Sequence, residues 1–234
     1  FFFKQKTAYE IKECDWSSDV CSSDLIGYFR SSAAFRVRIA LNLKGLSYDP
    51  ALISLPKGEH LAAAYTGVNP SGLVPALQDG DQLLTQSLAI MEYLDEVHPG
   101  PKLMPTDPLQ RAYVRALSQL IACEIHPLNN LRVLKHIRKT YGLDEEGVNS
   151  WYRHWIAEGF RMLEAFLVRE GRAGRYCLGD TPGLADCCLV PQVFNAQRYQ
   201  CDLTPYPTAM RIHAALLQLP AVLAATPDRQ PDAV

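Results

Sequence analysis

The sequence predicts an α/β domain followed by an all-helical domain. Short apolar runs alternate with amphipathic helical patterns over residues 25–97, in the order strand, helix, strand, hairpin and helix. Prolines then cluster between 99 and 108, and beyond them apolar residues recur only at helical spacing. We therefore expect a mixed sheet flanked by helices over 25–103, a helical domain over 107–222 and a polar, loosely held tail over 223–234.

The composition excludes several classes of protein. The chain has 234 residues, of which 48% are hydrophobic, and no apolar run is long enough to cross a membrane. Its net charge of -2 offers no basic surface for nucleic acid or for a membrane. The seven cysteines are odd in number and form no C-x-x-C motif, which favours a reducing compartment. We expect a soluble, cytoplasmic protein.

The first 24 residues differ from the rest of the chain. They show no helical or strand period, and they lack the apolar centre and cleavage site of a signal peptide. They resemble translated sequencing-adapter read-through, so we expect a non-native, disordered leader over 1–24. Without it the chain holds 20 basic and 20 acidic residues.

The individual elements of the first domain follow from pattern and turn chemistry. In chain order we expect a strand over 25–29, a helix over 32–44 ended by Gly45, a strand over 48–55, a weak helix over 59–65, a hairpin of 76–78 with 82–84, and a helix starting at Ser87. This order is the thioredoxin-like arrangement.

The second domain reads as a series of helices. Asp107 caps the first of them, with Pro108 at its first position. We expect helices over 109–123 with a break or kink at Pro127, over 131–139, over 145–169, over 187–199 and after 202–207.

Serines stand at the start of two of these helices. Ser31 or Ser32 begins the first helix, and Ser87 begins the helix after the hairpin. Free N–H groups and the helix dipole make such a terminus a ready site for an anion. The simpler interpretation is that the serines only cap their helices. Arg36 and Arg38, on the first helix, are expected to be solvated or structural.

Several short motifs together resemble one family. These are Arg30-Ser31-Ser32, Asn69-Pro70, Val74-Pro75, Gln86-Ser87, Leu178-Gly179-Asp180, Ala185-Asp186, Leu189-Val190-Pro191-Gln192 and the run from Asp202 to Pro207. Over residues 26–232 the chain resembles the zeta-class glutathione transferases, the maleylacetoacetate isomerases. The resemblance implies the glutathione transferase fold, a glutathione cofactor, a small dicarboxylate substrate and a homodimer.

The implied activity is cis–trans isomerisation of maleylacetoacetate to fumarylacetoacetate in tyrosine and phenylalanine catabolism. The glutathione thiolate would add to the cis double bond, allow rotation and leave again. The alternatives are maleylpyruvate isomerisation in gentisate degradation and glutathione transfer to small α-halo acids. A non-enzymatic binding protein is disfavoured because Ser31, Gln86 and Ser87 are all present.

The resemblance also assigns the site. Ser31 would activate the glutathione sulfur, with Ser32 as a second catalytic donor. The remaining cofactor contacts would come from Ala33, Lys57, His60, Val74, Pro75, Gln86, Ser87, His126 and Asn130. Val74-Pro75 would carry a cis peptide bond beside the cysteinyl part, and Gln86 and Ser87 would hold the γ-glutamyl carboxylate. The substrate carboxylates would meet Arg30, Arg198 and Arg132.

The chain departs from the family pattern at two positions. Ala33 stands where the family often has Cys, and Gly183 stands where it usually has Ser or Thr as a helix cap. We interpret the first change as tuning, because the scheme needs only the sulfur of glutathione. The second should weaken the cap by a few tenths of a kcal/mol. No set of His, Cys and carboxylates has the spacing of metal ligands, so no metal site is expected.

Overall fold

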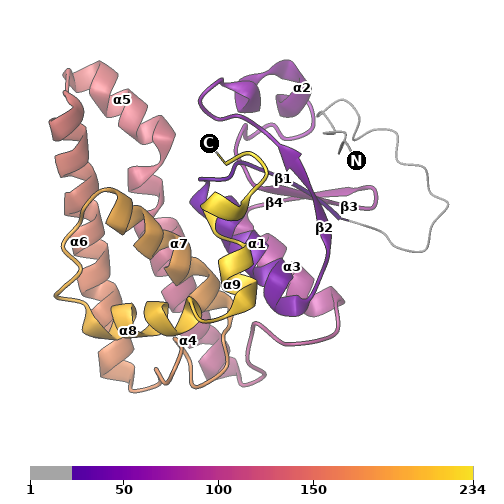
Figure 1. Cartoon of the computed structure of the whole chain (residues 1–234), viewed down its shortest axis with the longest axis vertical. Helices are drawn as coiled ribbons and strands as arrows, with labels where there is room; N and C mark the ends of the chain where they lie inside the picture. Colours follow the sequence, from indigo (N-terminus) through magenta and orange to yellow (C-terminus); the bar gives the residue numbers. More distant parts are fainter. Residues whose placement is uncertain (1–22, 234) are drawn as a thin grey trace. The chain divides into compact units, whose positions relative to one another are not determined.

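The computed structural model of the chain describes residues 23–233 (Figure 1). It divides into two compact units: one runs up to Pro101 and also takes in the chain from Ala221 onward, and the other is Lys102–Pro220. The named strands all lie in the first unit, and the second is built from helices, so the predicted fold class is confirmed. Most of the predicted leader, residues 1–22, lies outside the described residues.

The first unit contains a mixed four-stranded sheet with the order β2-β1-β3-β4. The strands are β1 (Ser23–Gly27), β2 (Tyr48–Leu52), β3 (Ala76–Asp79) and β4 (Gln82–Thr85). β1 pairs in parallel with β2 and antiparallel with β3, which forms the hairpin with β4. β1 starts two residues before the predicted boundary: Ser23 and Asp24 are buried and pair with Tyr48 and Asp49. The expectation of a disordered leader was therefore wrong for Ser23, whereas Asp24 had been considered as an extension of the strand.

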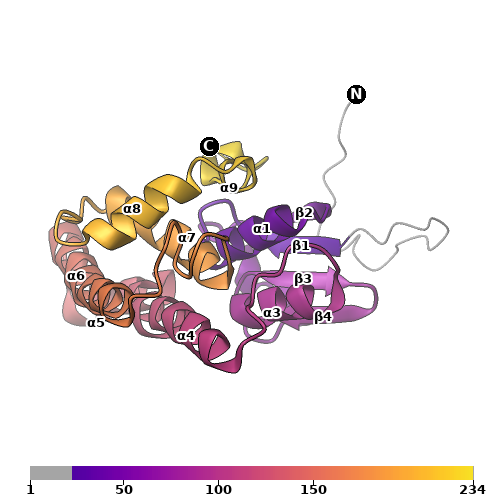
Figure 2. The ribbon, with the colours of Figure 1, turned by 90° about the horizontal axis from the view of Figure 1, so that it is seen from below.

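The helices of this unit complete the thioredoxin-like arrangement. They are α1 (Ser32–Lys44), α2 (Ala63–Thr66), α3 (Ser87–Val97) and the short 3₁₀ turn Glu59–Leu61. The range and the Gly45 stop of α1 are as predicted, with Gly45 in the left-handed region at φ 69°. α1 and α3 pack against each other (Figures 1 and 2).

α1 is buried on nearly every side, including its basic residues. Arg36 is 2% exposed and Arg38 is 4% exposed, so of the two expected alternatives, solvated or structural, the structural one is confirmed. At the end of the helix, Lys44 Nζ lies 3.3 Å from Asp95 Oδ1 on α3 and donates to the carbonyl of Pro101. Removing one partner of a buried ion pair strongly destabilises a protein, because the other charge is left buried and unpaired. The Lys44–Asp95 pair holds the C-terminal end of α1 against α3.

The end of the chain returns to the first unit. It forms α9 (Pro220–Ala224) and a 3₁₀ turn over Pro227–Arg229, and α9 lies beside α1 (Figure 2). Asn42 Nδ2 on α1 donates to the carbonyl of Ala221 at 2.9 Å. The expectation of a loosely held tail was wrong, because Gln230 donates to the carbonyls of Ala224 and Thr226 and Asp232 accepts from the N–H of Phe29.

The second unit contains five α-helices among its described residues. They are α4 (Pro108–Gln119), α5 (Leu131–Tyr141), α6 (Glu145–Glu170), α7 (Leu184–Arg198) and α8 (Pro207–Leu216). α4 packs against α7, and α6 packs against α8. Asp107 caps α4 as predicted, its carboxylate accepting from the N–H of Gln110 at 2.8 Å.

The predicted break near Pro127 takes the form of a wider helix. α4 continues as a π-helix over Leu120–Ile125, and a 3₁₀ turn over Pro127–Asn129 follows. Proline cannot donate the N–H that would continue the helix. Gly159 on α6 permits the close approach of this segment, because a Cβ there would collide with the side chain of Ile125.

The start of α7 depends on a buried carboxylate. Asp186 accepts from the backbone N–H groups of Gly183 and Cys177 at 2.8 and 2.9 Å. Burial raises the pKa of Asp186 to about 6, and these two donors oppose the rise. Gly183 itself has no room for a side chain, since a Cβ there would lie 2.7 Å from the carbonyl oxygen of Leu103. The glycine is therefore required sterically.

We predict that the extent of β1 can be measured by comparing two truncations. Removing residues 1–24 should lower the free energy of unfolding by about 1–3 kcal/mol relative to removing residues 1–22, because Ser23 and Asp24 lose their backbone pairing. Urea unfolding followed by circular dichroism gives both values. Equal stabilities of the two truncations would contradict the assignment of Ser23 and Asp24 to the strand.

We predict that Gly183→Ser destabilises the protein although serine is the better N-cap. The added Cβ must displace the Leu103 backbone, which should cost about 1–3 kcal/mol. Gly183→Ala serves as the matched control, because it adds the same atom without a capping hydroxyl. Thermal unfolding of the three proteins measures the effect, and a serine variant more stable than the parent would refute the steric argument.

Candidate active site

The N-terminus of α1 presents a serine hydroxyl that is already oriented. Ser31 is the N-cap, and its Oγ accepts from the N–H of Ala34 at 3.2 Å. The N–H of Ser31 donates to the carbonyl of Tyr28 at 2.9 Å. Because Oγ is the acceptor in the first bond, the hydroxyl proton can be donated to a ligand. Ser32, the first residue of the helix, is 6% exposed.

This helix end is electropositive. The first turn of α1 carries no acidic residue that would neutralise the helix dipole. Arg30 precedes the serines and is exposed, with its guanidinium 4.9 Å from the centre of the Phe29 ring. A thiolate beside Ser31 would therefore meet a hydroxyl donor, a helix N-terminus and a nearby cation. All three favour the ionised form of a thiol.

The loop before Ser31 is held on both sides by charged groups. Arg38 donates to the carbonyl of Phe29 at 2.9 Å and to that of Ala225 at 3.0 Å. The N–H of Phe29 donates to the carboxylate of Asp232 at 2.9 Å. Burial lowers the pKa of Arg38 to about 10, so it stays protonated at neutral pH. Both polar groups of the Phe29 backbone are thus fixed, and Arg38 has the structural role that we considered.

The N-terminus of α3 provides a second place for an anion. Gln86 is the N-cap but its side chain makes no capping hydrogen bond, and its backbone lies at φ 68°, ψ 112°. A non-glycine residue in such a conformation costs about 1–3 kcal/mol and is typical of functional sites. Ser87 is the first helical residue, and its Oγ accepts from Arg36 Nη1 at 3.2 Å. The simpler interpretation of Ser87 as an ordinary cap was therefore wrong.

The loop before β3 is shaped by the Asn69-Pro70 motif. The side chain of Asn69 donates to the carbonyl of Leu73 at 2.8 Å and accepts from Ser71. Tyr65 Oη donates to the same carbonyl at 2.6 Å. These bonds fix the residues that lead into Val74-Pro75, whose peptide bond is cis as predicted.

Lys57 and His60 lie on the segment between β2 and α2. Lys57 is exposed, and His60 is half-buried within the turn Glu59–Leu61. The Arg36–Ser87 hydrogen bond connects α1 to the start of α3. Lys57 and His60 lie on a different segment and take no part in that connection.

The remaining predicted residues lie in the second unit. His126 follows the π-helix, and Asn130 caps α5 by accepting from the N–H of Arg132 at 3.1 Å. Arg132 is exposed on the first turn of α5. Arg198 is the last residue of α7, exposed, with its guanidinium 4.9 Å from the centre of the Tyr199 ring.

Sequence reasoning missed two polar residues. One is Arg36, for which a solvated or structural role was expected but not the contact with Ser87. The other is Asn129, which is 8% exposed and has no hydrogen-bond partner for either amide atom among the described residues. The burial of these two side chains cannot be predicted from the sequence, because the segments that cover them are distant in the chain.

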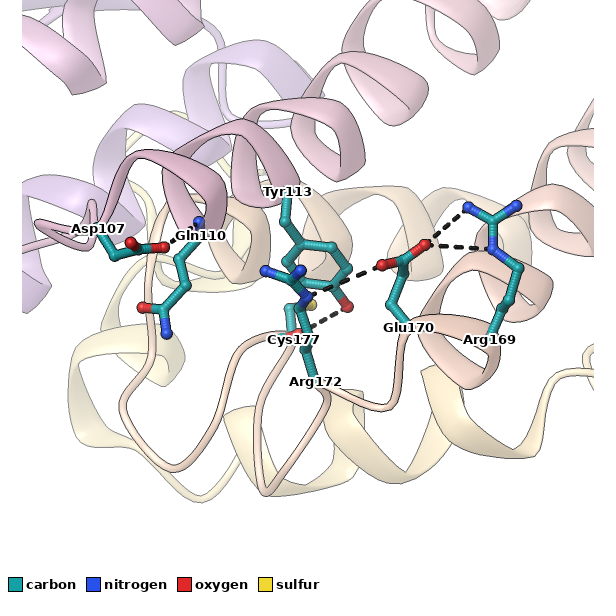
Figure 3. A network of polar contacts seen from close by, with 7 residues as sticks. All are labelled: Asp107, Gln110, Tyr113, Arg169, Glu170, Arg172 and Cys177. Carbon is teal, nitrogen blue, oxygen red and sulfur yellow. Dashed lines mark hydrogen bonds and ion pairs between the residues drawn. The ribbon is translucent and has the colours of Figure 1, made fainter.

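The second unit has a hollow of about 560 Å³ whose lining includes none of these residues. It is lined by Gln110, Arg172, Leu178, Gly179, Asp180 and Thr181. Figure 3 shows Arg172 beside the Tyr113 ring and Glu170, and Tyr113 Oη donates to the carbonyl of Cys177 at 3.2 Å. Burial raises the pKa of Tyr113 to about 12. This network ties α4 to the loop before α7.

Two other kinds of site are absent from residues 23–233. No group of three or more His, Cys, Asp or Glu in this part of the chain is arranged to hold a metal ion. Within the same residues, none of the helices combines the length and apolarity that a membrane crossing requires.

Comparison with known proteins identifies the family. A family model described as the N-terminal domain of glutathione S-transferase matches residues 30–97. Maleylpyruvate isomerase of a Ralstonia species is 50% identical over 208 residues, covering 89% of this chain and 98% of that protein. A probable maleylacetoacetate isomerase of Vibrio cholerae is 50% identical over 211 residues, covering 89% and 97%.

Comparison with solved structures identifies the same family. A maleylpyruvate isomerase described as a bacterial zeta-class glutathione transferase superposes with a TM-score of 0.88 at 49% identity, covering 90% of this chain and 100% of that one. A Methylobacterium extorquens maleylacetoacetate isomerase with bound malonate and glutathione gives 0.88 at 42% identity, covering 90% and 99%. The chain belongs to the maleylacetoacetate and maleylpyruvate isomerase family of zeta-class glutathione transferases.

Proposed function

We propose that the protein is a glutathione-dependent cis–trans isomerase that converts maleylacetoacetate to fumarylacetoacetate. The observation that carries this proposal is the Ser31 hydroxyl at the unneutralised N-terminus of α1, oriented by the N–H of Ala34. The identity with isomerases of this family supports the same reaction.

The residues of the first unit fit glutathione. Ser31 would donate to the sulfur, with Ser32 beside it, and Ser87 with Gln86 would hold the γ-glutamyl carboxylate at the start of α3. The backbone at Val74, next to Pro75, would meet the cysteinyl part, and Lys57 and His60 the glycyl carboxylate. Bound glutathione would supply a thiolate nucleophile that adds reversibly to the maleyl double bond.

The substrate carboxylates call for arginine. Arg30, beside the serine pair, would serve the carboxylate next to the reacting double bond, and Arg198 would serve the distant one. Arg132 is a third candidate, and His126 and Asn130 would add contacts to glutathione. Ala33, on the first turn of α1, brings no thiol of its own, and the proposed scheme needs only the sulfur of glutathione, which Ser31 would stabilise.

A second candidate substrate is maleylpyruvate. The observation that favours it is the 50% identity to the Ralstonia maleylpyruvate isomerase. The reaction and the roles of the residues are the same for both substrates, and only the position of the distant carboxylate differs. The choice therefore depends on the arginine that meets that carboxylate.

We further propose a cytoplasmic homodimer. The cysteines in the described part of the chain are all free thiols, as suits a reducing compartment; they are Cys123, Cys177, Cys187, Cys188 and Cys201. Burial raises the pKa of Cys177 and Cys187 well above the ordinary value, which makes these thiols poor nucleophiles. They therefore should not compete with glutathione for the substrate.

The activity should require glutathione without consuming it. Purified protein is assayed with maleylacetoacetate and with maleylpyruvate in parallel, while total free thiol is followed. We expect trans product, no turnover without glutathione, and constant thiol. S-methylglutathione, with its sulfur blocked, is the matched control and should support no reaction. Stoichiometric loss of thiol would instead indicate conjugation and refute the isomerase proposal.

Ser31→Ala should lower kcat by about 100-fold or more and change glutathione affinity much less, because the hydroxyl acts on the sulfur. Ser32→Ala should have the smaller effect on kcat. Ser31→Asp is the matched control: aspartate still caps α1 but offers the sulfur no proton when ionised. Steady-state kinetics should find Ser31→Asp as impaired as Ser31→Ala. An active aspartate variant would show that Ser31 only caps the helix.

A further inference from the structure

Arg36 connects the two helix ends that the proposed function uses. It lies on the second turn of α1 and is 2% exposed. Its Nη1 donates to the Oγ of Ser87, the first residue of α3, at 3.2 Å. A guanidinium is thus held inside the protein at the start of the helix where a carboxylate is expected.

The direction of this hydrogen bond decides what Ser87 can do. A guanidinium has donors and no acceptor, so Ser87 Oγ must accept from Arg36. The hydroxyl proton of Ser87 then remains for another acceptor. Without Arg36 the same hydroxyl would be free to rotate and to use its proton elsewhere. Arg36 therefore orients the Ser87 hydroxyl to donate its proton to a ligand before the ligand binds.

The charge of Arg36 acts in the same direction. The N-terminus of α3 is positive, and its first turn carries no acidic residue. Arg36 adds a full positive charge within hydrogen-bond distance of the first residue of that helix, in a buried place where screening by water is weak. A ligand carboxylate at this helix end would be attracted by the dipole, by the guanidinium and by the oriented hydroxyl.

We infer that Arg36 is a positioning residue that prepares the N-terminus of α3 to bind the γ-glutamyl carboxylate of glutathione, acting through Ser87. The inference rests on the proposed function for the identity of the ligand. It predicts that Arg36 contributes to the binding of glutathione and leaves the chemistry at its sulfur unchanged.

Arg38 provides a matched control on the same helix. It is buried to a similar degree, at 4% exposed, but its guanidinium donates to the carbonyls of Phe29 and Ala225 and not to α3. Loss of either arginine should destabilise the fold. Only the loss of Arg36 should discriminate between ligands that have and lack the carboxylate.

The experiment measures binding of two ligands by calorimetry. One is glutathione, and the other is γ-aminobutyryl-cysteinyl-glycine, which is glutathione without the α-carboxylate of its glutamyl residue. We expect Arg36→Met to weaken glutathione binding by about 10-fold or more and to leave the affinity for the analogue within about 2-fold. Arg36→Lys should recover part of the loss. Arg38→Lys should change both affinities by the same factor.

Kinetics provide a second readout. With Arg36→Met the KM for glutathione should rise by a factor similar to the loss of affinity, and kcat at saturating glutathione should stay within about 3-fold of the parent. If Arg36→Met does not fold, Arg36→Lys is compared in the parent and in Ser87→Ala. The lysine change should reduce the preference for glutathione over the analogue only when Ser87 is present.

The outcomes separate the inference from the proposed function. Equal weakening of both ligands by Arg36→Met, or no weakening of either, would overturn the inference, as would a parent protein that binds the two ligands equally. A parent that prefers glutathione, loses that preference with Arg36→Met and yet isomerises neither maleyl substrate would support the inference and overturn the proposed function.

Discussion

The candidate site depends on the hydrogen bonds between Arg38, a buried arginine of α1, and the backbone around it. Arg38 donates to the carbonyls of Phe29 and Ala225, and together with Asp232 it fixes the residue two positions before Ser31. The donors of a buried guanidinium cannot find water in place of these carbonyls, so displacing the loop would leave a charge poorly solvated. The position of the Ser31 hydroxyl is thus set by interactions that are expensive to disturb, which is how a protein keeps a site preorganised.

The sequence correctly predicted those features of the fold that depend on a few neighbouring residues. The bounds of α1 depend on Ser31 and on the left-handed Gly45, and both can be recognised from a few neighbouring residues. The cap at Asp107 and the cis bond before Pro75 are equally local. The sequence also placed serines at the starts of α1 and α3, where the structure has them.

The same reasoning failed where residues far apart in the chain decide the outcome. Arg36 and Arg38 were expected to be solvated or structural, and the sequence did not decide between the two, because charged residues seldom lie inside. Burial of α1 by α3 on one side and by the C-terminal segment on another cannot be inferred from the period of α1 alone. Gly183 gives a similar lesson. Its sequence context marks it as a weak cap, and only the carbonyl of Leu103, 80 positions earlier, explains why a side chain is excluded there.

The contact between Asp232 and Phe29 makes the candidate site sensitive to a residue that is remote from it in the sequence. Asp232 lies 203 positions after Phe29, and its carboxylate accepts from the backbone N–H of Phe29, two residues before Ser31. Because Asp232 belongs to no helix or strand, a substitution that removes its carboxylate would spare every element described above. It would nevertheless release one side of the loop that leads to the Ser31 hydroxyl. A change at Asp232 would therefore loosen the candidate site while leaving the fold in place.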